Sequence, residues 1–344
     1  MIKKIPILSL TFEKLTRLLQ FHFGKGSYHA AAIMREIFLH GNSDFSHVKE
    51  FSRSGNLAQN IMESLQILSL PIVQQKKDDG VIKWTSRLSD GNYVESVIIP
   101  MTYHHTLCIS SQVGCRMACR FCQTGQMGFI RQLTTEEIIA QVYAAIFQFN
   151  VPIRNVVFMG MGEPLDNFEN VMDAIHVLTD PRGFDFPKKY ITVSTAGHIP
   201  GIKQLACSNP KGIHLAISIN AANDRLRNQL MPINRKYSLS DLQKVLANYP
   251  LKSKGVLFIE YVLINNINDS NEDADQLAEF LSPLRVRINV IPYNAQKGIS
   301  YETPSRDTLN RFCDRLIEKN IYVRKRATKG QGLMAACGQL GGHR

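Results

Sequence analysis

GCRMACRFC, residues 114–122, places Cys115, Cys119 and Cys122 in the spacing C-x3-C-x2-C. Three thiolates at this spacing can bind three irons of a 4Fe–4S cluster and leave the fourth iron without a protein ligand. An open iron can bind the amino and carboxylate groups of S-adenosylmethionine (SAM) and pass one electron to it. The alternatives are a structural zinc site, which needs a fourth ligand that does not follow at a matching spacing, and a redox disulfide motif, which needs C-x2-C alone.

The chain around this motif alternates between strand and helix patterns from Tyr93 onward. Strands are expected at 94–99, 106–110, 155–160, 190–195, 213–219, 256–264 and 286–293. Helices are expected at 135–149, 239–249 and 305–319, and Thr134 with Glu137 forms a capping box before the first of them. The repetition predicts an α/β fold with a parallel sheet, open or closed into a barrel, whose functional residues lie at the carboxyl ends of the strands.

The first part of the chain has a different pattern. Helical periodicity at 28–39 and 54–68 precedes short alternating segments around Trp84, where Asp79-Gly80 predicts a β-hairpin. We therefore expect an accessory domain at 1–92, mainly helical with a small hairpin region and in contact with the substrate, and a catalytic domain at 93–344.

Polar residues stand at the ends of several predicted strands. Gly162 and Glu163 follow one of them in GMGEP, where glycine allows a ligand to approach the backbone and the carboxylate could accept hydrogen bonds from the ammonium group of SAM. Four further residues occupy such positions, and although each alone could be a turn former, together they favour cofactor contacts: Ser194, Ser218, Asn220 and Asn294.

Composition and charge narrow the class of protein. The 344 residues are 44% hydrophobic, and no stretch is long and apolar enough to cross a bilayer. The apolar run near the N-terminus is too short for a signal peptide, and seven cysteines, an odd number, do not suit a secreted disulfide framework, so a cytoplasmic location is expected.

The formal net charge of +11 suggests a polyanionic partner rather than any particular fold. Basic residues gather near the cysteine loop, before one predicted strand and toward the C-terminus: Arg116, Arg120, Arg131, Lys188, Lys189, Arg324, Lys325, Arg326 and Lys329. They could be solvated surface charges, but their position beside the expected reactive centre favours a nucleic-acid substrate.

Four cysteines lie outside the triad. Cys313 has apolar neighbours at helical spacing and is expected in the core, and Cys207 is expected to be incidental. Cys108 lies in the strand that leads to the cysteine loop, and Cys337 lies in AACGQLGG after the glycine-bearing segment KGQG, which we expect to be a mobile loop. The residues alone leave open whether these two are structural.

Five stretches of the chain resemble motifs of the radical-SAM adenine methyltransferases of RNA, the RlmN/Cfr family: TLCISSQVGCRMACRFCQTG (106–125), VVFMGMGEPLDN (156–167), YITVSTAG (190–197), LMPIN (230–234) and AACGQL (335–340). The resemblance covers nearly the whole chain. It implies a partial (βα)6 TIM-like barrel with an N-terminal accessory domain, a 4Fe–4S cluster on the cysteine triad, and two SAM molecules per turnover.

The resemblance also implies roles for single residues. Cys337 takes a methyl group from one SAM, and a 5′-deoxyadenosyl radical from the second SAM removes a hydrogen from that methyl group. The carbon radical adds to adenine, and Cys108 then releases the covalent protein–RNA adduct by forming a disulfide with Cys337. Glu95 matches the family's proposed base. The SAM contacts carried over are Gly162, Glu163, Ser194, Ser218, Asn220 and Asn294.

Two stretches depart from the family pattern. Asn220 stands where most relatives have His, and GQGLM precedes AACGQL where relatives have an acidic GDDID-like run. The expected product is 2-methyladenosine in 23S rRNA, with tRNA as a further substrate, because GEPLDN resembles the housekeeping branch. The alternatives are C8 methylation, as in the Cfr branch, a radical-SAM enzyme with a non-RNA substrate, and an inactive RNA-binding paralogue. A flavodoxin- or ferredoxin-type electron donor and a monomer are also expected.

Overall fold

The computed structural model describes residues 4–52, 55–208, 212–296, 298–326 and 330–341. Within these residues a ten-stranded sheet organises the chain, in the order β14-β13-β12-β11-β10-β9-β6-β5-β4-β3. The strands from β6 to β14 run parallel, and β5, β4 and β3 extend the sheet antiparallel. Their bounds are β3 Ile72–Asp78, β4 Val81–Arg87, β5 Tyr93–Pro100, β6 His105–Cys108, β9 Ile153–Phe158, β10 Ile191–Thr195, β11 His214–Ser218, β12 Leu257–Leu263, β13 Val286–Pro292 and β14 Val323–Lys325.

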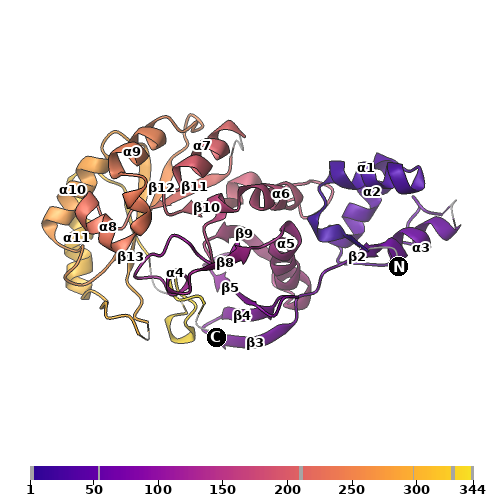
Figure 1. Cartoon of the computed structure of the whole chain (residues 1–344), viewed down its shortest axis with the longest axis horizontal. Coiled ribbons are helices and arrows are strands. Elements are labelled where there is room, and N and C mark those ends of the chain that lie inside the picture. Colours follow the sequence, from indigo (N-terminus) through magenta and orange to yellow (C-terminus); the bar gives the residue numbers. More distant parts are fainter. Residues whose placement is uncertain (1–3, 53–54, 209–211, 297, 327–329, 342–344) are drawn as a thin grey trace.

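Helices connect the parallel strands and cover the outer side of the sheet (Figure 1). One helix follows each of β6, β9, β10, β11, β12 and β13, which makes six βα repeats in the described residues: α5 Thr135–Tyr143, α6 Phe168–Leu178, α7 Ile199–Cys207, α9 Leu239–Ala247, α10 Asn271–Leu281 and α11 Arg306–Glu318. A short helix, α8 Asp224–Leu230, precedes α9. Because residues from β6 through β14 line one cavity, the sheet curves into an incomplete barrel. The expected α/β fold is therefore confirmed.

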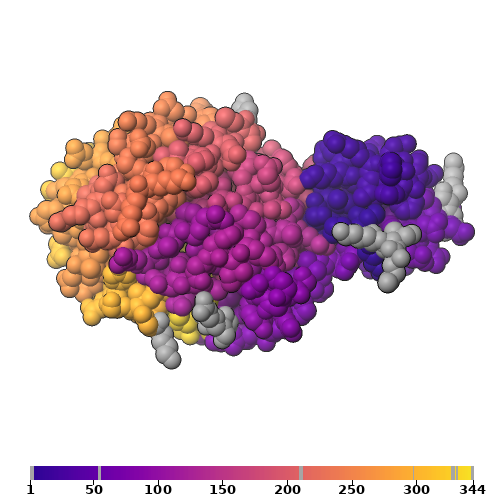
Figure 2. Space-filling model, in the orientation of Figure 1, coloured from indigo at the N-terminus to yellow at the C-terminus, as the bar shows by residue number. Residues whose placement is uncertain are grey.

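The N-terminal helices form a lobe at one end of the molecule (Figures 1 and 2). They are α1 Phe12–Phe23, α2 Ser27–Met34 with its π-helical continuation η2 Arg35–Leu39, and α3 Gly55–Ser64. The lobe packs on the barrel through aromatic and ionic contacts. The rings of Phe38 and Phe184 lie 5.3 Å apart, the Arg182 guanidinium lies 3.2 Å from the centre of the Phe12 ring, and Lys14 pairs with Asp173.

Local signals account for most helix boundaries. Thr134 and Glu137 form the expected capping box at the start of α5, and Ser238 accepts a hydrogen bond from the Asp241 N–H at the start of α9. The helix expected at 135–149 continues beyond Tyr143 as a π-helix, η3 Ala144–Gln148. None of the helices in the described ranges is long and apolar enough to cross a membrane.

Four features differ from the sequence predictions. The helix expected at 54–68 ends at Ser64, because β2 Leu65–Gln66 pairs with β1 Ile5–Pro6. The hairpin of β3 and β4 hydrogen-bonds to β5, so the sheet continues across the domain boundary expected at residue 92. The strand β14 and the small sheet of β7 Gln112–Gly114 and β8 Phe129–Gln132 were not predicted. Ser54 and Lys329 lie outside the described residues.

Candidate active site

A cavity of about 630 Å³, called the chamber below, occupies the concave side of the sheet. Cys108, at the end of β6, and Cys337 both line it. The register of β6, β9, β10, β11 and β12 places Cys108, Ser194 and Ser218 on the same face of the sheet as Glu260, which also lines the chamber. Residues that are far apart in the sequence therefore lie on the same concave face of the sheet.

The three clustered cysteines lie on the loop that joins β7 to β8, at the carboxyl end of the barrel. Cys115 is buried and its N–H donates to the Gly128 carbonyl oxygen at 2.9 Å. Cys122 N–H donates to the Cys119 carbonyl oxygen at 3.2 Å, and Cys122 precedes the short helix α4 Gln123–Gln126. Gly125 allows this compact turn, since a side chain there would lie 2.7 Å from the Cys119 carbonyl oxygen.

The surroundings of the three thiols suit an iron–sulfur cluster. Burial raises the pKa of Cys115 and Cys119, and so does the proximity of the cysteine sulfurs to one another; burial also raises the pKa of Cys122. Buried thiols become thiolates when a cation compensates the charge, which is what iron supplies. All seven cysteines are free thiols. Among the described residues no three His, Cys, Asp or Glu side chains are arranged to hold a single metal ion, whereas a cubane binds each cysteine to a different iron.

Glu163 occupies the turn that follows β9 and is only 2% exposed. Its carboxylate accepts hydrogen bonds from the N–H groups of Leu165 (3.1 Å) and Ala196 (2.7 Å), and thereby ties the ends of β9 and β10 together. Burial raises the pKa of Glu163 to about 7, although these N–H donors oppose the shift. Its charge also raises the pKa of Cys115 and Cys119, so it lies beside the cluster loop.

Gly162 gives Glu163 this position. Its φ of +104° is a conformation that side-chain-bearing residues rarely adopt, and a Cβ atom there would lie 2.5 Å from the Gln112 Cβ and 2.8 Å from the Gln112 backbone nitrogen. We expect Gly162→Ala to lower the free energy of unfolding by about 2–4 kcal/mol, because backbone strain and a clash with β7 add together. Denaturant titration measures this loss. Gly91→Ala is the control, since Gly91 also has positive φ (+85°) but nothing within 4 Å; equal losses in the two variants would contradict the role of the close approach to Gln112.

The other expected SAM contacts lie at strand ends but differ in their surroundings. Asn220 is buried, with φ of +57°; its Oδ1 accepts from the Val262 N–H at 2.8 Å and its Nδ2 contacts the Met231 sulfur at 3.2 Å, so the side chain joins β11 to β12. Asn294 lines the chamber, and its Nδ2 lies 3.5 Å from the Cys337 carbonyl oxygen.

Buried polar atoms after β13 indicate space for a ligand. Tyr293 OH, Asn294 Oδ1 and Gln296 Oε1 have no hydrogen-bond partner among the described residues. Buried polar atoms are rarely left in this state unless a ligand or water completes them. They lie near the cysteine loop, since Gln296 Nε2 donates to the Phe121 carbonyl oxygen at 2.8 Å, and polar atoms of this kind suit the polar groups of SAM.

Arg227 is a site residue that the sequence analysis missed. It is 1% exposed and donates to the carbonyl oxygens of Ile219 (3.0 Å) and Ala196 (2.8 Å), so it fastens the ends of β10 and β11. Burial lowers its pKa to about 10, and its charge opposes the rise in the pKa of Cys119. Its only sequence signal is an arginine on the helix after a strand end, which is indistinguishable from a surface charge.

Cys108 and Cys337 meet in the chamber. Burial raises the pKa of Cys108 to about 12, and the nearby Cys337 sulfur adds to the rise. Desolvation by the surrounding protein likewise raises the pKa of Cys337, although its side chain is exposed to solvent, whereas Arg326, which is also close to Glu260, lowers it. Both thiols are thus mainly protonated at neutral pH, and Arg326 is the nearby cation that favours the reactive thiolate of each.

Lys83 and Glu95 hold both ends of the segment that carries Cys337. They form a buried ion pair, with the Lys83 Nζ 3.0 Å from the Glu95 Oε1. Lys83 Nζ also donates to the Met334 carbonyl oxygen (2.7 Å), and the Gly341 N–H donates to Glu95 Oε2 (2.7 Å). The segment before and after Cys337 is therefore fixed to β4 and β5, and the carboxylate expected to act as a base already has strong partners.

We expect Lys83→Met to loosen the segment that carries Cys337 and, for the role that the resemblance implies, to slow methylation of Cys337 while leaving SAM cleavage in place. The change frees the Met334 carbonyl and removes the ammonium partner of the buried Glu95 carboxylate, which costs about 3 kcal/mol. Intact-protein mass spectrometry measures the methyl group on Cys337, and chromatography measures 5′-deoxyadenosine. Lys76→Met is the control, because Lys76 is exposed and stands opposite Lys83 in the hairpin. Normal methylation of Cys337 in the Lys83 variant would contradict the anchoring role.

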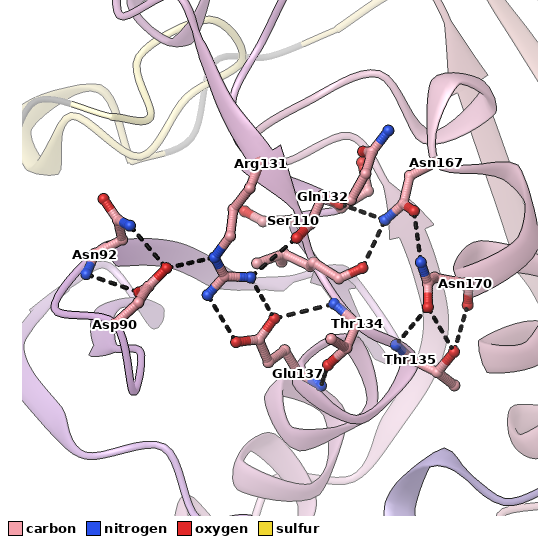
Figure 3. Close-up of polar contacts among 12 residues, drawn as sticks. Asp90, Asn92, Ser110, Arg131, Gln132, Thr134, Thr135, Glu137, Asn167 and Asn170 are labelled. Carbon is pink, nitrogen blue, oxygen red and sulfur yellow. Dashed lines mark hydrogen bonds and ion pairs between the residues drawn. The ribbon is translucent and has the colours of Figure 1, made fainter.

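Two arginines near the cysteine loop are neutralised by carboxylates. Figure 3 shows Arg131 between Asp90 and Glu137. The Arg131 guanidinium lies 2.5 Å from an Asp90 carboxylate oxygen and 2.8 Å from a Glu137 carboxylate oxygen. Arg116 pairs with Asp166 at 2.8 Å. These two side chains stabilise the loop and the start of α5. Of the three arginines that we expected beside the cysteines, Arg120 alone forms no ion pair in the described part of the chain.

Comparisons with known proteins show to which family the chain is similar. The profile of the radical SAM superfamily matches residues 109–281. The chain is 44% identical over 340 residues to a probable dual-specificity RNA methyltransferase RlmN 1 of Protochlamydia amoebophila (strain UWE25), which covers 99% of this chain and 95% of that protein. It is 42% identical to the dual-specificity RNA methyltransferase RlmN of Geobacter sulfurreducens (strain ATCC 51573 / DSM 12127 / PCA), over 98% of this chain and 92% of that protein.

A solved structure is similar over the same length. The crystal structure of a radical SAM methyltransferase from Sphaerobacter thermophilus superposes with a TM-score of 0.89 at 35% identity, and covers 97% of this chain and 98% of that one.

Proposed function

Because the chain belongs to the RlmN family of radical SAM RNA methyltransferases, we propose that it forms 2-methyladenosine in 23S rRNA, with tRNA as a second substrate. The observation that carries the proposal is the chamber, which Cys108 and Cys337 both line, with the two sulfurs near enough for Cys337 to raise the pKa of Cys108. A radical SAM enzyme without a methyl-carrying cysteine has no use for this pair. Cytoplasmic location and a monomer stay predictions from the sequence.

The proposed roles are those that the resemblance to the family implies, and the positions described above support them. Cys115, Cys119 and Cys122 would hold the 4Fe–4S cluster, and Gly162, Glu163, Ser194, Ser218, Asn220 and Asn294 would contact or frame SAM. The cluster, reduced by a flavodoxin- or ferredoxin-type donor, would supply the electron that cleaves SAM.

Cys337 would accept a methyl group from a first SAM and present that carbon to adenine after a second SAM is cleaved. Each turnover would therefore use two SAM molecules. Arg326 favours the thiolate that this displacement needs. Cys108 would attack the Cys337 sulfur, so that a disulfide forms as the carbon–sulfur bond to the product breaks. Glu95 would hold the segment through Gly341 and, as a further proposal, accept the ring proton of adenine.

Nucleoside mass spectrometry tests the product. The protein is expressed in a host that lacks its own family member, and nucleosides from rRNA and tRNA are compared with and without expression. A gain of 2-methyladenosine in either pool supports the proposal. A gain of 8-methyladenosine moves the reaction to the other carbon, as in the Cfr branch, and no new methyladenosine contradicts an adenosine substrate.

A further inference from the structure

Positive charge gathers at the amino ends of the parallel strands, opposite the cysteine loop. A second cavity of about 400 Å³ lies there and shares Lys189, His214 and Phe258 with the chamber, so the two cavities adjoin. Six cations line the second cavity or the amino-end mouth of the chamber, and we call them the amino-end tract: Arg154, Lys189, Lys252, Lys254, Arg287 and Arg324.

The charge of this tract is uncompensated. No Asp or Glu of the described residues lines the second cavity. In the described part of the chain none of the six cations forms an ion pair, whereas Arg116 and Arg131 beside the cysteine loop both do. Unpaired cations gathered around adjoining cavities attract a polyanion, since phosphate contacts supply most of the affinity of proteins for nucleic acids.

The tract leads to the reactive cysteines. The chamber extends from Arg154 and Lys189, at the amino ends of β9 and β10, to Cys108 and Cys337 at the carboxyl ends. Its volume is in the range of pockets that hold nucleotide-sized ligands. At the mouth, Arg154 lies 4.5 Å and Lys189 lies 5.1 Å from the centre of the Tyr190 ring. An aromatic ring flanked by cations suits a base beside its phosphates.

The opposite end of the chamber is covered. The Gln123 N–H donates to the Gly338 carbonyl oxygen at 2.7 Å, and Thr124 Oγ1 donates to the Leu340 carbonyl oxygen at 2.6 Å. Gln339 Nε2 donates to the Ala295 carbonyl oxygen at 3.0 Å. These bonds close the C-terminal segment over the cysteine loop, and Figure 1 shows that segment beside α4. In the described residues the C-terminal segment is thus held against the cysteine loop, on the side of Cys337 away from the amino-end tract.

We propose that the RNA strand crosses the amino ends of the barrel strands with its phosphates on the amino-end tract, and that the target adenosine enters the chamber from this side. The cluster and SAM would then lie on the carboxyl side of the target adenine carbon. Cys337 would lie between that carbon and SAM. The inference rests on the proposed function for its substrate and adds the surface and the direction of entry.

Charge reversal tests the surface. Binding of a fluorescein-labelled RNA stem-loop with an unpaired loop adenosine is measured by anisotropy with cluster-loaded enzyme, at several salt concentrations and without reductant. We expect Lys252→Glu/Lys254→Glu to weaken binding by about tenfold or more. The slope of log K against log salt should also fall by about 1 for each phosphate that no longer meets a lysine. The affinity for SAM should not change.

The matched control is Lys203→Glu/Lys244→Glu, which makes the same change in net charge at exposed residues of α7 and α9. Equal affinity and equal salt slope in the two double variants would overturn the proposal. The binding assay needs no turnover, so a wild-type protein that binds RNA through the tract and never methylates it contradicts the proposed function alone.

Crosslinking tests the direction of entry. A 4-thiouridine placed next to the loop adenosine is expected to crosslink to peptides that contain Arg154 or Tyr190. Crosslinks confined to the peptide around Gln123 would place the RNA at the carboxyl side and overturn the proposed path.

Discussion

Replacing Cys108 with alanine is expected to leave RNA covalently attached to the protein. Cys108 shares the chamber with Cys337, and the two sulfurs are close enough for one to raise the pKa of the other; the remaining cysteines lie on the cysteine loop or outside the chamber. In the proposed mechanism, the bond between Cys337 and the product carbon would have no thiol to break it once Cys108 is replaced. Denaturing gels and mass spectrometry of the nuclease-treated protein measure the adduct.

Other cysteines of the chain provide the controls for this experiment. Cys108→Ala/Cys337→Ala should give no adduct, because the methyl-carrying sulfur is gone, and Cys207→Ala should turn over normally, because Cys207 is exposed on α7. If the Cys108→Ala variant gives free product and no adduct, the proposed release by disulfide formation is contradicted. An adduct that persists in the double variant would mean that another residue carries it.

Replacing Cys119 with alanine should abolish both cluster binding and methylation. In the proposed site the triad would offer one thiolate to each of three irons, so removal of one ligand would leave a second iron open and the cluster would be lost. We expect activity to fall by more than the ~100-fold loss typical of changes around a metal ligand. Iron and sulfide analysis, together with 5′-deoxyadenosine formation, measures the two effects separately.

Cys313→Ala is the comparison for that variant, since Cys313 is fully buried in the core on α11. It should lose stability and keep iron. If Cys119→Ala retains a full complement of iron and cleaves SAM, the triad is not the cluster site. Retained folding in the Cys119 variant, checked by circular dichroism, separates loss of a ligand from loss of the protein.

The strands and helices of the barrel were predictable because they repeat. Each parallel strand is a short apolar run, and local capping signals such as Thr134 with Glu137 mark the helix that follows. The site residues at strand ends follow from the same rule, which places them along one edge. Pairing of short strands was not predictable, as β14 and the pair of β7 and β8 show, because three or four residues carry too little pattern.

Long-range partners were also beyond the sequence. Glu95 and Gly341 are 246 residues apart, and nothing local to either residue indicates their hydrogen bond. The buried position of Lys83 could have been predicted, because Lys83 alternates with the buried residues Val81 and Thr85 on one face of β4. A lysine at such a position needs a buried partner. Arg116 and Arg131 show the reverse case, because two of the three arginines in an apparent basic patch are neutralised by ion pairs.

Isotope tracing tests the central claim, that the methyl carbon passes through Cys337 as a radical. The purified, cluster-loaded enzyme is given RNA, reductant and SAM with a trideuterated methyl group, and the product nucleoside is analysed by mass spectrometry. The account predicts methyladenosine that retains two deuterium atoms, with the third in 5′-deoxyadenosine, because one hydrogen is removed from the methyl group on the cysteine. A product that retains all three deuterium atoms would mean direct transfer of an intact methyl group and would contradict the account.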